Sequence, residues 1–261
     1  MSASGGDVHE KEDYFRVRVA RQKRERMRGR LLAATMSLCA ERRGSGPLVI
    51  DDVVQRADVS RGTFYKYFDS VGAAVEEVGR QAVDDLVAAL RVLVADQSDP
   101  LMRICLGNCA LLTRAAIEPA WGGFVGHSVY VNDAQSIRLG MREAVISSCA
   151  AGAFDVPNVE VAVDFHIGLA LQGIRRVVRS GFDEAYIRDV ATLATTGLGV
   201  DRGRGSQIAA RAMELLFAKG PTVLGWWPKD EAAFQARPDA ALADTTDGDR
   251  ANVATGSGAA S

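Results

Sequence analysis

The stretch LVIDDVVQRADVSRGTFYKYFDSV, residues 48–71, decides the fold of this chain. It holds two short segments with helical patterning, Asp51–Ala57 and Arg61–Tyr67, which are separated by a turn at Asp58. Such a turn needs one residue in the left-handed conformation, and Asp is among the few residues besides glycine that tolerate it. Ser60 is a good N-cap for the second segment because its hydroxyl can accept from otherwise unpaired amides. The pattern predicts a helix-turn-helix.

The two segments share one apolar face. Phe64 and Phe68 lie about 40° apart on a wheel of about 100° per residue, so both point to the same side. We expect a small helix-turn-helix core formed by Val53, Val54, Ala57, Val59, Phe64 and Phe68. Ser60, the N-cap of the second segment, lies at its edge.

The opposite face of the second segment is polar. It carries Gly62, Thr63 and Lys66, with Tyr65 at its edge, while Arg61 and Tyr67 flank the buried side. Hydroxyl groups, a cation and a glycine that permits close approach suit a DNA major groove and its phosphates. The competing interpretation is a short surface helix with ordinary polar residues.

A basic block precedes this stretch. Residues 16–43 contain ten basic and two acidic residues, a net charge of +8, whereas the whole chain of 261 residues has a net charge of −2. The rest of the chain is therefore acidic, and the asymmetry indicates a polyanionic partner. We expect Arg28 and Arg30 in this block to contact DNA; the alternative is a solvated basic helix end.

These residues resemble the DNA-binding domain of TetR-family transcriptional regulators. The resemblance is close over about residues 20–75, and beyond them only the helical architecture matches. The matching positions are Ile50, Asp52, Val53, Ala57, Val59, Ser60, Gly62, Thr63, Phe64, Tyr65, Tyr67 and Phe68.

The resemblance implies that Asp51–Ala57 braces the DNA backbone while Arg61–Tyr67 enters the major groove. Thr63, Tyr65, Lys66 and Tyr67 match family positions that usually touch phosphates or base edges. The expected DNA contacts are these four residues together with Arg61 and Gly62, and with Arg28 and Arg30 of the basic block. Arg61 fits either a bidentate contact to guanine or a phosphate anchor.

Three positions depart from the family pattern. Asp58 stands where glycine is usual, and Val54 stands where alanine is usual. Val71 occupies a position where the family commonly has a phosphate-binding lysine, and its loss should weaken nonspecific affinity.

The rest of the chain also has helical periodicity. Apolar residues recur at steps of three and four in a long helix after Val71, and strand signals are nearly absent. Further helices are expected near 101–117, 134–151, 159–180, 183–198 and 206–218, with an irregular, aromatic-rich stretch at 121–130. The expected fold is all-α, with an N-terminal three-helix domain joined by a linker helix to a helical body.

The chain is expected to have four parts. They are a mobile N-terminal arm (1–15), a helix-turn-helix DNA-binding domain (16–70), an effector-binding and dimerisation body (71–218) and a mostly disordered tail (219–261). The tail is assigned because large apolar residues become rare after residue 228, which leaves too little surface to bury.

The family resemblance also implies that the body dimerises and binds an effector. Apolar stripes in 159–180 and 183–198 would pair with a second copy; the alternative is that they pair within the chain. A twofold dimer reads a palindromic operator in double-stranded DNA. The effector would be a small hydrophobic molecule in a chamber formed by Trp121, Phe124, His127, Tyr130 and Phe154, while His166 is interpreted as an interface histidine.

Several function classes find no support in the sequence. There is no nucleophile elbow, phosphate loop, Rossmann glycine motif or metal-ligand cluster, so we expect no enzyme, cofactor or metal. Cys105 and Cys109 share a helix face but have no further ligand at a suitable spacing. The longest uncharged stretch, 119–132, is too short to span a membrane, and no signal peptide is evident, which together predict a cytoplasmic protein.

The sequence therefore predicts a ligand-responsive, homodimeric DNA-binding repressor. The alternative is a helical protein-interaction module whose helix-turn-helix no longer binds DNA.

Overall fold

The computed structural model describes residues 6–42, 46–128, 131 and 134–234, and in these ranges the helical prediction is confirmed: every element is a helix. The elements are α1 (Gly6–Arg42), α2 (Ile50–Ala57), α3 (Arg61–Phe64), α4 (Val71–Leu93), α5 (Pro100–Ile117), α6 (Pro119–His127), α8 (Gln135–Ala150), α9 (Val159–Ser180), α10 (Glu184–Thr196), α11 (Arg202–Val223) and the short 3-10 helix η1 (Glu231–Phe234).

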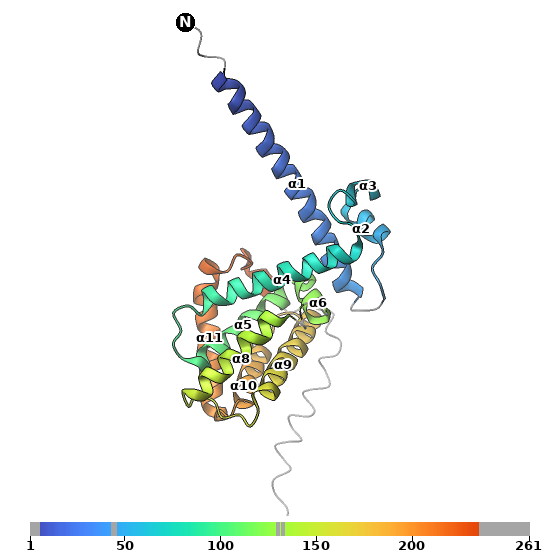
Figure 1. Cartoon of the computed structure of the whole chain (residues 1–261). Coiled ribbons are helices and arrows are strands. Elements are labelled where there is room, and N and C mark those ends of the chain that lie inside the picture. Colours follow the sequence, from blue (N-terminus) through green and yellow to red (C-terminus); the bar gives the residue numbers. More distant parts are fainter. Residues whose placement is uncertain (1–5, 43–45, 129–130, 132–133, 235–261) are drawn as a thin grey trace, which may run out of the picture.

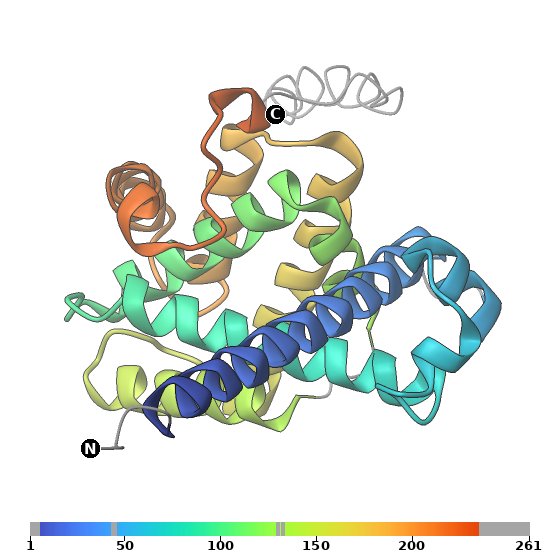
Figure 2. The same cartoon turned by 90° about the horizontal axis from the view of Figure 1, so that it is seen from above.

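The N-terminal helices stand at one end of a helical body. Figure 1 shows α2 and α3 beside the C-terminal half of α1, whose N-terminal half projects away from the rest of the molecule. Helix α4 runs from α3 across the body formed by α5, α8, α9, α10 and α11. Figure 2 looks down on the molecule from above, so that the projecting helix α1 is drawn in front of the helices below it.

Helix α1 begins earlier than the sequence pattern indicates. Its first residue is Gly6, whereas the apolar periodicity starts at about Arg16. The predicted mobile arm (1–15) therefore overlaps the helix by ten residues, and residues 1–5 lie outside the described ranges. The reason for the difference is that polar residues can extend an existing helix without an apolar stripe, since propagation is easier than nucleation.

The helix-turn-helix and the body share a continuous core. Val53, Ala57, Phe64 and Phe68 are buried in the same cluster as Leu31 of α1, and the cluster continues through α4 into α5 and α6. Of the other expected core residues, Val59 and Val54 are half-buried against it, and Ser60 is exposed as the cap of α3. The boundary predicted at residue 70 therefore does not separate two hydrophobic cores.

Helix α6 was not predicted, because three glycines in its nine residues reduce its helix propensity. The glycines let α6 pack closely on its neighbours. A β-carbon on Gly123 would lie 2.8 Å from Cβ of Ala40 in α1, and one on Gly122 would lie 2.8 Å from the backbone oxygen of Ala115 in α5. Close packing on both sides outweighs the weak intrinsic propensity.

The apolar stripes of α9 and α10 mostly face the interior of the chain. Val163 and Ile174 of α9, and Ile187 and Ala194 of α10, are buried against the protomer's own helices. The alternative of an intramolecular core therefore accounts for these stripes. The outward faces of the two helices carry a different set of apolar side chains, which is described under the proposed function.

The predicted tail begins too early. Helix α11 continues to Val223, and an aromatic cluster of Phe182, Phe217, Trp227 and Phe234 has ring centroids 5.0–6.0 Å apart. The few aromatic residues after residue 218 bury enough surface to order the chain to residue 234. The remaining part of the expected tail, 235–261, lies outside the described residues.

Candidate nucleic-acid interface and internal cavity

The turn between α2 and α3 has the left-handed residue that the sequence predicts. Asp58 has φ 50° and ψ 58°, and its amide donates to Gln55 O at 3.2 Å. The amide of Val59 donates to Val54 O at 3.0 Å. This pair of hydrogen bonds is the Schellman motif, which satisfies carbonyls at the end of α2. It ends α2 abruptly and sets the direction in which α3 leaves.

We expect Asp58→Gly to stabilise the protein by about 0.5–1 kcal/mol, because glycine adopts positive φ without a steric penalty. Thermal unfolding of the full chain measures the effect as a rise in Tm. Asp58→Val is the matched opposite change and should lower Tm, since a β-branched residue is strongly disfavoured at this φ. A lower Tm for Asp58→Gly would show that the aspartate side chain itself contributes more than the turn costs.

Helix α3 is short and firmly capped. Ser60 Oγ accepts from the amide of Thr63 at 3.1 Å and lies 3.0 Å from Thr63 Oγ1. Phe64 is fully buried, and its ring contacts those of Tyr65 and Phe68 with centroids 5.7 and 5.8 Å apart. The buried ring and the cap fix the orientation of the polar face.

The polar face of α3 and the turn after it is accessible. Gly62, Tyr65 and Lys66 are exposed, and Thr63 and Tyr67 are half-buried. Within the described part of the chain, no carboxylate pairs with Lys66. Its ammonium group is therefore available to a phosphate.

Arg61 is engaged by Asp51 of α2. Its Nε and Nη2 donate to the two carboxylate oxygens at 2.7 and 2.5 Å, and both side chains are exposed. This bidentate pair occupies the same donors that would grip guanine or a phosphate. DNA contact by Arg61 therefore requires exchange of one partner for another, which an exposed ion pair permits at low cost.

Arg28 and Arg30 have partners within the protein. Arg28 Nη2 lies 2.9 Å from Glu77 Oε1 of α4, with its guanidinium over the ring of Phe68. Arg30 Nη2 donates to the carbonyl of Ala57 at 2.5 Å, at the end of α2. Both arginines therefore hold the helix-turn-helix in place, a role that the sequence pattern did not indicate.

Other cations of α1 lie nearer to its free N-terminal half. Arg24 lies over the ring of Tyr67 with its Cζ 6.0 Å from the centroid. Lys23 and Arg26 are exposed, and neither forms an ion pair within the residues that the structure describes. They extend the basic surface from α3 along α1.

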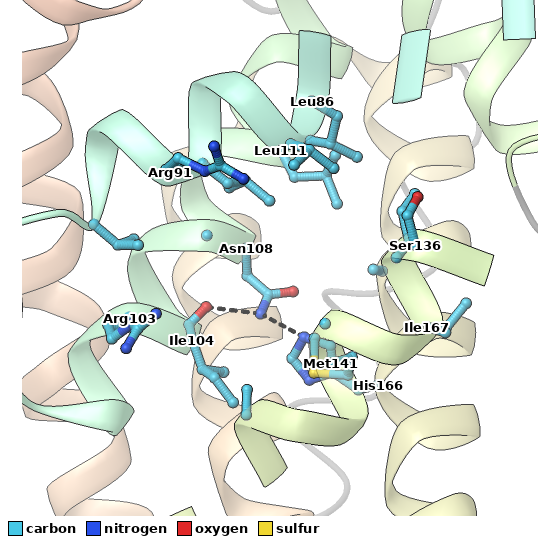
Figure 3. Close-up of a pocket in the computed structure, with 18 of the residues that line it drawn as sticks. Leu86, Arg91, Arg103, Ile104, Asn108, Leu111, Ser136, Met141, His166 and Ile167 are labelled. Carbon is cyan, nitrogen blue, oxygen red and sulfur yellow. Dashed lines mark hydrogen bonds between the residues drawn. The ribbon is translucent and has the colours of Figure 1, made fainter. Parts of the chain in front are cut away.

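The body contains a cavity of about 650 Å³, within the usual range for small-molecule sites. Its walls are mainly apolar and come from α4, α5, α8 and α9 (Figure 3). Leu86 and Leu111 line one side and Ile167 lies opposite, whereas Arg91 and Arg103 are exposed at its edge.

The residues that the sequence analysis expected to form the effector chamber do not form the walls of this cavity. Trp121, Phe124, His127 and Phe154 do not line this cavity, and Tyr130 lies outside the described residues. The reason is that these side chains pack within the core: Trp121 and Phe124 are buried in the main cluster, and Phe154 belongs to a second one. His127 is half-buried, with Nδ1 3.0 Å from Gly123 O.

Two of the polar residues that line the cavity are buried. Asn108 of α5 and His166 of α9 are buried, with Asn108 Nδ2 3.2 Å from His166 Nε2 (Figure 3). Burial lowers the pKa of His166 to about 4, so its imidazole is neutral near pH 7. The sequence analysis interpreted His166 as an interface histidine and did not identify Asn108. The only sequence signal for this pair is that each polar residue interrupts an otherwise apolar helix face.

Cys105 and Cys109 face the core. Both are buried, and burial raises the pKa of Cys105 to about 12 and that of Cys109 further. Protonated thiols are weak ligands and poor nucleophiles. Their environment indicates packing rather than metal binding.

Two helices connect the cavity with the N-terminal domain. Helix α4 packs on α1 and also lines the cavity with Leu86. Helix α6 lies between α1 and α9, and Arg175 Nε of α9 donates to Gly126 O at 2.7 Å. The helices that line the cavity are therefore connected to α1 by direct packing contacts.

Comparison with known proteins gives one family match. Residues 31–78 match the family model described as "Bacterial regulatory proteins, tetR family". No curated protein sequence matches the chain. Among the described helices, none is both long and apolar enough to cross a bilayer.

Several solved structures have a similar fold. RolR in complex with resorcinol is 22% identical, with a TM-score of 0.55 over 73% of this chain and 96% of RolR. A gamma-butyrolactone receptor, an ArpA-like protein, is 14% identical with a TM-score of 0.56 over 73% and 98%. The TetR-family protein CprB from S. coelicolor A3(2) is 12% identical with a TM-score of 0.57 over 73% and 98%.

Proposed function

We propose that the chain is a DNA-binding transcriptional regulator of the TetR family rather than an enzyme, and that it acts as a homodimeric repressor controlled by a small effector; the family-model match over residues 31–78 and the similar folds support this proposal. The DNA-binding domain would comprise residues 16–70, and the effector-binding and dimerisation body would begin at residue 71.

The accessible face of α3 and of the turn after it carries the proposal. Tyr65 and Lys66 project from a capped, rigid segment, and the basic surface of α1 continues from it. A phenol and an ammonium group suit phosphates and base edges in the major groove. A helix-turn-helix that no longer bound DNA would have no need to keep such a face.

A dimer would use the outward faces of α9 and α10. Val161 and Phe165 of α9 and Leu193 of α10 are exposed apolar side chains. Phe165 lies against Gly197, one helical turn beyond Leu193, so the three belong to one region of the surface. A twofold pairing of this region would present two α3 segments to a palindromic operator.

An effector in the cavity would act through α4 and α6. Two proteins of similar fold have small ligands: RolR is in complex with resorcinol, and the other protein is a gamma-butyrolactone receptor. This similarity supports a small effector here. To change the DNA-competent population from 1:99 to 99:1, an effector must prefer one state by about 5.5 kcal/mol.

Selection of genomic fragments by the purified chain near physiological salt tests the function. The control is the double variant Tyr65→Ala/Lys66→Ala, which leaves the buried core unchanged. Recovery of a shared palindrome with the wild type, and its loss with the double variant, is the expected result. Absence of any enriched sequence would favour a protein-interaction module.

We expect Lys66→Ala to weaken binding by a similar factor on operator and unrelated DNA. The reason is that a phosphate contact releases a counterion whatever the sequence, so log K against log salt should become shallower by about one. Fluorescence anisotropy at several salt concentrations measures both quantities. Lys229→Ala, an exposed lysine after α11, is the matched control. A loss confined to one operator base pair would instead make Lys66 a base-reading residue.

A further inference from the structure

The N-terminal half of α1 is a helix that stands apart from the core. Every residue from 16 to 26 is exposed, whereas burial in the main cluster begins at Leu31. Figure 1 shows this half of the helix extending past α2 and α3 and away from the body. An isolated helix without tertiary packing is only marginally stable in water. Burial against the rest of the described chain therefore does not account for this part of α1.

The exposed segment is strongly basic. Residues 16–26 include six cations and one carboxylate, that of Glu25, which pairs with Arg21. Lys23 and Arg26 form no ion pair within the ranges that the structure describes. At about 100° per residue, the side chains of Lys23, Arg24 and Arg26 point in three different directions around the helix axis. The segment therefore presents positive charge on several sides, which suits a polyanion.

Arg24 marks the point at which α1 passes the DNA-binding face. Its guanidinium lies over the ring of Tyr67 with Cζ 6.0 Å from the centroid, and Tyr67 directly follows Lys66 in the chain. From Arg24 the helix continues outward to Gly6. At about 1.5 Å per residue, this part of the helix is about 27 Å long. DNA that contacts Tyr65 and Lys66 would therefore have the basic part of α1 beside it.

We propose that the N-terminal half of α1 is a second DNA-binding element, which binds the phosphate backbone next to the bases that α3 contacts. A helix with its side chains is about 10–12 Å wide, too wide for a minor groove of about 6 Å. Cations on several sides of a helix also lack the single face that base recognition requires, and phosphate contacts carry no sequence information. The segment therefore contributes affinity that is independent of sequence. This inference rests on the proposed DNA binding and adds a contact outside α2 and α3.

Fluorescence anisotropy with the full chain at several salt concentrations tests the proposal, on the selected operator and on an unrelated duplex. The triple variant Arg21→Gln/Lys23→Gln/Arg26→Gln removes three exposed cations, and glutamine has a similar helix propensity. Each lost phosphate contact makes log K against log salt shallower by about 0.9. We expect the slope to become shallower by about one or more, and affinity for both duplexes to fall about fivefold or more near 0.15 M salt.

The triple variant Arg202→Gln/Arg204→Gln/Arg211→Gln is the matched control. These arginines are exposed cations of α11, which belongs to the body and lies away from α3 in Figure 1. The control changes the net charge by the same amount as the α1 variant. It should bind both duplexes with an affinity within threefold of the wild type, because the effect depends on position. Chemical denaturation checks that both variants keep the stability of the wild type.

Hydroxyl-radical footprinting on the operator locates the contact. The wild type should protect backbone positions next to each half-site that the α1 variant leaves open to cleavage, whereas protection within the half-sites persists at saturating protein. Identical footprints for the two proteins would contradict a separate contact by α1.

Other results would also overturn the inference. One is wild-type affinity and slope in the α1 variant, and another is an equal loss in the α11 control, which would assign the effect to net charge. A loss on the operator without a loss on the unrelated duplex would make the segment a reader of sequence. In each of these cases the wild type still binds DNA, so the proposed function stands. A wild-type chain that binds neither duplex would refute both the proposed function and this inference.

Discussion

Phe64→Ala is expected to abolish operator binding and to destabilise the protein by about 3–5 kcal/mol, the usual range for deleting a buried phenylalanine. Phe64 is fully buried in the main hydrophobic cluster, and its ring contacts Phe68 with centroids 5.8 Å apart. The smaller side chain leaves a cavity under the segment that should enter the groove. Chemical denaturation and operator binding by anisotropy measure the two losses.

Tyr65→Ala is the matched control, because the neighbouring ring is 57% exposed. It should reduce affinity while leaving the free energy of unfolding within about 0.5 kcal/mol of the wild type. The pair of variants separates the support of the interface from the interface itself. Wild-type stability for Phe64→Ala would contradict the burial of this ring.

The helix-turn-helix could be predicted because its constraints are local. Ser60 caps within three residues, Asp58 must adopt a positive φ, and Phe64 and Phe68 are one helical turn apart. Each of these requirements can be checked against the residue types in a short window. The all-helical body follows from periodicity in the same way.

The partners of Arg28 and Arg30 could not be predicted. Glu77 lies 49 positions after Arg28, and the carbonyl of Ala57 that receives Arg30 has no signature in the sequence. A basic run indicates a positive surface, but it does not say which cations the fold uses for itself. Tertiary structure decides this.

The position of the cavity could not be predicted from the sequence, for a similar reason. A ligand chamber lies where helices fail to fill the space between them, and aromatic residues are as suited to closing such a space as to lining it. Trp121 and Phe124 fill space between helices in the main core and do not line the cavity. Asn108 and His166 come from helices 58 positions apart and meet only in the folded chain.

Lowering the pH from 7 to 5 is expected to destabilise the protein by about 2 kcal/mol through His166 alone. The folded-state pKa of His166 is lowered to about 4 by burial, against an ordinary value of about 6.5. Between these values the unfolded chain binds a proton that the folded chain does not. The contribution of His166 to the free energy of unfolding is therefore fully present above about pH 6.5 and decreases as the pH falls toward 4.

This window is separate from that of Glu77, a partly buried carboxylate with a strongly lowered pKa. Glu77 accepts hydrogen bonds from Arg80, Arg28 and Gln81, which lower its pKa to about 2. Its contribution is present above about pH 4.5 and is lost only below that value. A comparison of pH 7 with pH 5 therefore leaves the Glu77 contribution unchanged.

Urea denaturation at pH 7 and pH 5, with wild type, His166→Gln and Met141→Leu, measures the difference. Glutamine cannot titrate, so His166→Gln should lose about 2 kcal/mol less than the wild type between the two pH values. Met141→Leu alters the same cavity without removing the histidine and should keep the wild-type loss. Equal pH dependence for all three proteins would mean that His166 is open to water in the folded chain.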